Sequence, residues 1–334
     1  MPLILERNNV LDVYARAAQN RWVVPTFCSE NLTTTESILS AVLEYSRIIG
    51  QPDIPVTVAI TNKYHHRSQS VNYTHTRRWD IGLNLFLADL EVLTRKGSPF
   101  ENLSVMIHLD HTQWDRDEQL LQWDMYRFSM IMYDASELPF DQNIKRTSEF
   151  VEKNHDKIVI EGACDEILDA TGKEESRLTT PGSASKYFDE TGVDYIVANL
   201  GTEHRASVAE LKYHSDLARE ISKLTGPKLV LHGTSSVGLE QLRNLFDDGI
   251  AKVNIWTSLE RDSSPVLFED MVKNASRIIG KERTEKLIEK GLLGDKADKS
   301  GKPDLSHYTT LYRQDIIFSK MKEIVLDYLR LWYV

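Results

Sequence analysis

The chain has 334 residues, enough for two ordinary domains or for one large α/β barrel, and its formal net charge is −10. This net negative charge argues against binding to nucleic acid or to an anionic membrane, since both carry the same sign of charge. The N-terminus becomes charged at Glu6, too early for a signal peptide, and no apolar run is long enough to span a bilayer. The two cysteines, Cys28 and Cys164, lack disulfide-framework spacing, are predicted to be buried, and indicate a reducing, cytoplasmic location.

Short β-branched runs alternate with longer amphipathic segments along the whole chain. Eight runs are predicted to be buried parallel strands, at residues 23–28, 55–61, 103–110, 128–133, 158–164, 195–200, 228–232 and 251–255. Helices are predicted between them, for example at 35–48, 141–154, 208–224 and 239–248. Such alternation implies βαβ units, and eight strands in this length favour a (β/α)₈ barrel over an open sheet.

Two regions do not fit a bare barrel. The loop 62–79 follows the second strand and is rich in Lys, His and Arg, so it is either a solvated surface loop or a substrate lid that recognises an anion. The polar stretch 291–306 is predicted to be a linker before a last helix at 312–332, whose apolar stripe indicates core packing or a subunit contact. We therefore predict one domain over 1–334, an α/β barrel to about residue 280 with a C-terminal helical extension at about 281–334.

Three histidines follow strand-length apolar runs: His111, His204 and His232. A single histidine at a strand end is more often a hydrogen-bonded core residue than a ligand. Three at the same rim of a barrel, one of them beside Asp110, make a metal site equally plausible, because neutral imidazoles can hold one Zn²⁺ and leave a position open. Asp110 has the alternative role of capping the next helix.

Six segments, in the right order, resemble class II, zinc-dependent ketose-phosphate aldolases of the fructose-bisphosphate aldolase family. They are His108-Leu-Asp-His111, Met130-Ile-Met-Tyr-Asp-Ala-Ser136, Gly192-Val-Asp-Tyr195, Gly201-Thr-Glu-His204, Leu229-Val-Leu-His-Gly233 and Gly249-Ile-Ala-Lys-Val-Asn254. The resemblance implies a TIM barrel, which agrees with the pattern of strands and helices, and a homodimer or higher homo-oligomer.

The resemblance also assigns roles. It implies that His111, His204 and His232 bind zinc, and that Asp110 exchanges a proton with the substrate's C4 hydroxyl. A zinc ion with three neutral ligands keeps its full charge and can stabilise the enediolate left by retro-aldol cleavage. Glu174 or Glu175 is the candidate for the acid that protonates the enediolate, the alternative being an acidic surface loop. The predicted substrate-binding residues are Lys63, Arg205, Gly233, Ser235, Asn254 and Thr257.

The chain departs from the family at its anion sites. Arg205 stands where the family has glycine, and Thr234 and Ser236 replace two further glycines. The phosphate-binding arginine of one branch is absent from Tyr308-Thr-Thr-Leu311, although Arg313 is near. With its metal core kept and both phosphate pockets altered, the chain is predicted to cleave a ketose monophosphate, a sugar acid or a bulky ketose rather than fructose bisphosphate. The alternatives are a non-catalytic relative that supports a partner subunit, and a sugar epimerase that uses the same metal.

Overall fold

Eight parallel strands close into a barrel in the computed structural model, which describes residues 3–123, 125–167, 178–205 and 211–334. Each strand pairs with its neighbours in chain order, and β8 returns to pair with β1. The strands are β1 Val24–Cys28, β2 Pro55–Thr61, β3 Ser104–Gln113, β4 Met130–Asp134, β5 Val159–Ala163, β6 Tyr195–Val197, β7 Leu229–Leu231 and β8 Ile250–Ile255. The predicted barrel is therefore confirmed, and all eight predicted strands are present.

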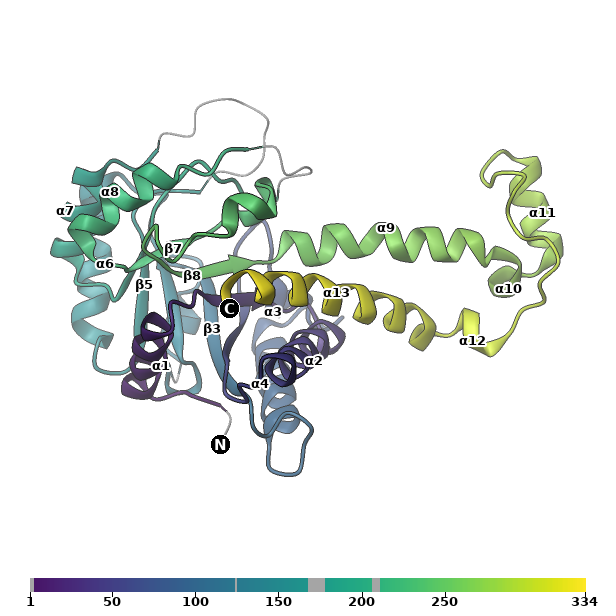
Figure 1. Ribbon diagram of the computed structural model, residues 1–334, viewed down its shortest axis with the longest axis horizontal. Coiled ribbons are helices and arrows are strands. Elements are labelled where there is room, and N and C mark those ends of the chain that lie inside the picture. Colours follow the sequence, from purple (N-terminus) through teal and green to yellow (C-terminus); the bar gives the residue numbers. More distant parts are fainter. Residues whose placement is uncertain (1–2, 124, 168–177, 206–210) are drawn as a thin grey trace.

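Helices cover the outside of the barrel, so the residues of the strands are buried on both faces of the sheet (Figure 1). They are α1 Arg7–Gln19, α2 Leu32–Ile49, α3 Gln69–Asn72, α4 Trp79–Thr94, α5 Glu118–Leu121, α6 Phe140–Asn154, α7 Pro181–Thr191 and α8 Ser215–Thr225. The side chain of Asn31 caps the N-terminus of α2, and Gly50 ends the helix in the left-handed conformation that glycine adopts without strain.

A helical arm projects from the barrel after β8 (Figure 1). It comprises α9 Thr257–Lys273, α10 Ala275–Ile279, α11 Lys281–Glu289, α12 Leu305–Tyr308 and the returning α13 Thr310–Trp332. The excursion starts with α9, earlier than the expected residue 281, and the polar stretch after Gly291 connects α11 to α12. The C-terminal half of α13 packs against the barrel's helices, so its predicted apolar stripe contributes to the core there.

Two helix predictions need correction. Residues 239–248 form a short 3₁₀ turn at Leu239–Leu242 followed by further turns, in which the amides of Asp247 and Asp248 donate to carbonyls three residues back rather than four. The helix expected at 208–224 begins only at Ser215 within the described residues.

Both cysteines are buried and free. None of the described helices combines the length and apolar character needed to cross a bilayer.

Candidate metal centre and active site

The three strand-end histidines meet at the C-terminal end of the barrel. One ring nitrogen from each of His111, His204 and His232 lies within 4.8 Å of the other two, and the ring centroids are 5.0 to 5.6 Å apart. They come from β3, from the segment after β6 and from the end of β7, three elements that only barrel closure brings together. The predicted convergence of these rings is therefore present in the structure.

Two of the three remaining ring nitrogens contact carboxylates. His111 Nδ1 lies 2.8 Å from Asp134 Oδ2, and His232 Nε2 lies 3.1 Å from Glu161 Oε1. His111 Nε2, His204 Nε2 and His232 Nδ1 are buried and have no hydrogen-bond partner among the described residues. A carboxylate that orients a metal-ligating histidine through its second nitrogen is the usual arrangement around zinc. The donor set therefore fits a divalent transition metal.

Burial keeps two of the three rings in the neutral state that binds a metal. It lowers the pKa of His204 well below its usual value, and the neighbouring His111 and His232 lower it further. Burial also lowers the pKa of His232, despite its contact with Glu161. For His111 burial alone would lower the pKa, but Asp110 and Asp134 raise it. Metal binding has to displace a proton at this one position when that ring is protonated.

A β-bulge explains how the adjacent residues Asp110 and His111 both serve one site. Side chains of consecutive strand residues normally point to opposite faces. Here the register with β4 shifts between Leu109 and Thr112, and His111 has a φ of 43°. A bulge redirects side chains in this way, and a left-handed non-glycine residue costs about 1–3 kcal/mol. The sequence required a backbone turn at this point, and the bulge provides it inside a strand that continues to Gln113.

Asp110 is buried among donors. Arg67 Nη2 donates to its Oδ2 at 2.5 Å, and Asn254 Nδ2 donates to its Oδ1 at 2.9 Å. Burial alone would raise the pKa of Asp110, but His111, His108 and Arg67 lower it well below its usual value. The carboxylate is therefore ionised near neutral pH and able to accept a proton. It does not cap a helix, since it lies within β3.

A fully buried ion pair lies inside the barrel beneath this site. Lys252 Nζ donates to Glu161 Oε2 at 2.7 Å and to Asn254 Oδ1 at 2.5 Å, while the other Glu161 oxygen contacts His232. Burial alone would raise the pKa of Glu161, but Lys252 and His232 lower it to about 2. The pair links a candidate ligand, His232, to the amide that contacts Asp110. Both residues could have been recognised in the sequence as charged residues within apolar strands.

We expect Glu161→Gln to destabilise the protein by about 3–5 kcal/mol, because it leaves Lys252 as an uncompensated buried charge. Chemical denaturation at neutral pH measures this loss. A matched control, Glu149→Gln, removes a half-exposed carboxylate 3.7 Å from Arg146 and should cost under about 1 kcal/mol. Because the folded-state pKa of Glu161 is depressed, its ionic contribution is present above about pH 4.5 and is lost as the pH falls towards 2. Equal losses in the two variants would contradict this account.

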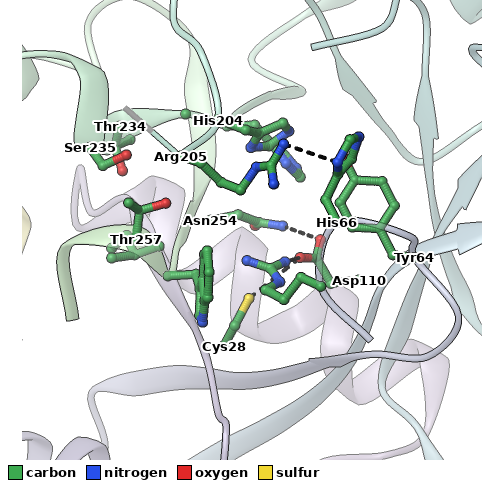
Figure 2. Close-up of a pocket in the computed structure, with 15 residues that line it drawn as sticks. Cys28, Tyr64, His66, Asp110, His204, Arg205, Thr234, Ser235, Asn254 and Thr257 are labelled. Atoms are coloured by element: carbon green, nitrogen blue, oxygen red, sulfur yellow. Dashed lines mark hydrogen bonds and ion pairs between the residues drawn. The ribbon is translucent and has the colours of Figure 1, made fainter. Parts of the chain in front are cut away.

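The predicted substrate-binding residues, Lys63 apart, gather in one pocket beside the histidines (Figure 2). Arg205, Gly233, Ser235, Asn254 and Thr257 line it together with Asp110, His204 and His232. Gly233 has a φ of 67°, and a Cβ there would lie 2.8 Å from the backbone of Glu203, so only glycine fits. Arg205 has a φ of 53°, so it holds the left-handed conformation that glycine adopts most readily.

Other predicted residues lie elsewhere. Lys63 is not among the residues that line this pocket, and its ammonium lies 5.8 Å from the ring centroid of Trp79. Glu174 and Glu175 lie outside the described residues, so their proposed role stays a prediction. Sequence reasoning missed the roles of Tyr64, whose ring stacks on His111 with centroids 4.4 Å apart, and of Trp256, which lines the pocket.

The chain is similar to one known family of proteins. The family model described as "Fructose-bisphosphate aldolase class-II" matches residues 8–291. A fructose-bisphosphate aldolase from Staphylococcus epidermidis is 26% identical over 277 residues, covering 80% of this chain and 86% of that protein. One from Giardia intestinalis is 37% identical over 145 residues, a match that covers 41% of this chain and 44% of that protein.

Solved structures show the same fold at low sequence identity. A fructose-bisphosphate aldolase from Campylobacter jejuni superposes with a TM-score of 0.72 at 16% identity, covering 99% of this chain and 95% of that one. The YdjI aldolase from Escherichia coli K12 superposes with a TM-score of 0.63 at 18% identity, covering 99% of this chain and 97% of that one.

Proposed function

Because this chain belongs to the class-II fructose-bisphosphate aldolase family, a family of metal-dependent lyases, we propose that it is a zinc enzyme acting on a substrate other than fructose bisphosphate. Its reaction is the reversible aldol cleavage of a ketose phosphate or a related sugar acid. The observation that carries the proposal is the meeting, beside an ionised carboxylate, of three buried imidazole nitrogens that have no hydrogen-bond partner in the part of the chain that the structure describes.

His111, His204 and His232 would hold the metal, with Asp134 and Glu161 fixing the orientation of two of the rings. When bound, the metal supplies Lewis acidity that stabilises the negative charge left by C–C cleavage. Three neutral ligands suit this task because they do not offset the charge of the ion. Zinc is the ion proposed, since imidazole nitrogens in a three-histidine set are a common catalytic zinc site.

Asp110 acts as the base that takes the proton from the hydroxyl destined to become the aldehyde carbonyl. Arg67 and Asn254 hold the carboxylate from two sides, which fixes its position relative to the histidines. Asn254 is itself held by Lys252, so the orientation of the base depends on the buried ion pair. A base held within hydrogen-bond reach of the reacting hydroxyl contributes about 10²- to 10⁴-fold to the rate.

The altered pocket supports a substrate other than fructose bisphosphate. Arg205 brings a side chain to a position that glycine leaves open in the family, and its guanidinium contacts His66 Nδ1 at 2.9 Å. Ser235 and Thr257 keep hydroxyl groups in the pocket, so polar recognition of a substrate remains available there. Arg205 therefore changes the shape of the site while the proposed metal and base positions are kept.

Turnover should depend on zinc. Zinc-loaded protein is expected to cleave at least one ketose monophosphate or sugar acid faster than fructose 1,6-bisphosphate, to lose activity on chelation, and to regain it when zinc is returned. A coupled assay for the released aldehyde measures this. One zinc per chain without turnover across such a panel would support a non-catalytic relative instead. A stereoisomeric product carrying solvent deuterium, formed without a free aldehyde, would indicate an epimerase.

The oligomeric state, the cellular location and the class of ligand are also proposals. A homodimer or higher homo-oligomer is supported by large apolar side chains exposed on the arm, including Phe268, Leu305 and Leu311. A cytoplasmic location is supported by the two free, buried cysteines. A small sugar or sugar phosphate, rather than nucleic acid or membrane, is the proposed ligand, in keeping with the acidic composition.

A further inference from the structure

A buried arginine from the loop after β2 ends in the pocket beside Asp110. The Arg67 side chain is 10% exposed, and its guanidinium carbon lies 4.8 Å from the ring centroid of Trp256. Among the described residues its guanidinium makes one hydrogen bond, from Nη2 to Asp110, while Nε is buried with no partner. Because a guanidinium carries five N–H donors, this group retains donors in a place where an unused buried donor is costly.

The surrounding contacts hold Arg67 in place. Thr61 Oγ1 donates to the Arg67 carbonyl, and the Thr61 amide donates to Gln69 Oε1 at 2.9 Å. Glu30 Oε1 then accepts from both Gln69 Nε2 at 2.7 Å and Trp256 Nε1 at 2.6 Å. The loop and the aromatic ring beneath the guanidinium are thus tied to one carboxylate. Such bracing lowers the entropic cost of binding a ligand to a long side chain.

Lys63, Arg77 and Arg78 of the same loop are not among the residues that line the pocket. Lys63 lies over Trp79, and Arg78 pairs with Asp80 at the exposed start of α4. Arg313, the residue nearest to the family's missing phosphate-binding arginine, lies in the first turns of α13, on the arm (Figure 1). Arg67 is therefore the arginine that this loop places in the pocket.

We propose that Arg67 forms an anion subsite that binds a carboxylate or phosphate on the aldehyde half of the substrate. The inference rests on the proposed aldol reaction, in which Asp110 takes the proton of the hydroxyl that becomes the aldehyde. A group that lies against Asp110 therefore faces the aldehyde half. Ser235 and Thr257 lie across the pocket from Asp110 in Figure 2, which leaves them for the other half. The planar N–H donors of a guanidinium suit fork-like binding of either anion.

The test uses calorimetric binding of three aldehydes to the zinc-loaded full chain: D-glyceraldehyde 3-phosphate, glyoxylate and uncharged D-glyceraldehyde. We expect Arg67→Met to weaken binding of at least one anionic aldehyde by about 10- to 100-fold and to change D-glyceraldehyde much less. The affinity of Arg67→Lys for the anionic aldehyde should lie between those of the wild type and Arg67→Met, because lysine keeps the positive charge but lacks the paired, planar N–H donors of the guanidinium. The matched control is Arg78→Met, which removes the same charge from an exposed position on this loop and should bind like the wild type.

Each outcome has a distinct meaning. The anion that shows the larger Arg67-dependent loss identifies the subsite as one for phosphate or for carboxylate. Equal weakening of charged and uncharged aldehydes by Arg67→Met, or no weakening at all, overturns the proposal. A loss of affinity for the anionic aldehyde in Arg78→Met equal to that in Arg67→Met overturns it as well. Aldol turnover of the wild type is measured in parallel: Arg67-dependent binding without turnover defeats the proposed function alone, whereas turnover without Arg67 dependence defeats the subsite alone.

Discussion

Replacing His204 with alanine is expected to remove the metal and with it the activity. His204 contributes one of three ring nitrogens that lack a hydrogen-bond partner within the described ranges, and two imidazoles alone are too few ligands for a stable catalytic zinc site. We expect zinc content to fall from about one ion per chain to near zero, and kcat/KM to fall by at least about 10³-fold, since Lewis-acid stabilisation contributes several kcal/mol. Metal analysis of dialysed protein and the aldehyde-release assay measure the two effects.

The control for this variant is His155→Ala, which removes an imidazole from the exposed end of α6. It should keep full zinc and full turnover. The thermal midpoint of the His204→Ala protein without metal should stay close to that of the metal-free wild type, because the buried His204 Nε2 has no hydrogen-bond partner among the described residues that the substitution would remove. Full zinc retention in His204→Ala would show that the ligand assignment is wrong.

The barrel and the meeting of the histidines could both be predicted from short-range sequence patterns. Apolar runs of strand length mark buried parallel strands, and chain order then determines which strands are neighbours. His111, His204 and His232 each follow such a run, so barrel closure places all three at one rim. That deduction needs no knowledge of side-chain contacts, which is why it could be made from the sequence.

The structure adds what depends on tertiary contacts. The bulge at His111 depends on how β3 pairs with β4, and no local signal marks it. The indole of Trp332, far along the chain, donates to the Leu242 carbonyl in the segment predicted to be a helix. Arg67 is one of several cations in its loop, and only the path of the folded loop shows that it, rather than Lys63, contacts Asp110. Patterns in sequence therefore predict the meeting of the three histidines at the rim better than they predict which side chains contact one another in the pocket.

Asp110→Asn is expected to separate metal binding from proton transfer. The amide is isosteric with the carboxylate and can still accept a hydrogen bond from Asn254 or Arg67 through one oxygen, but it cannot take a proton from the substrate. Zinc content should therefore stay near one ion per chain. The value of kcat should fall by about 10²- to 10⁴-fold, the usual contribution of a general base.

Asp115→Asn provides the matched control for this change. It removes an equal charge five residues further along, from an exposed aspartate that caps the Arg116 amide. Its turnover and zinc content should equal those of the wild type. If Asp110→Asn lost zinc together with activity, Asp110 would act by supporting the ligand His111 instead of as a base, and the bulge would then matter for holding the ion alone. If it kept both, proton transfer would have to be assigned to another group. Retained zinc with lost turnover is the result that ties the ionised state of Asp110 to chemistry, because its contacts with Arg67 and His111 hold it in that state.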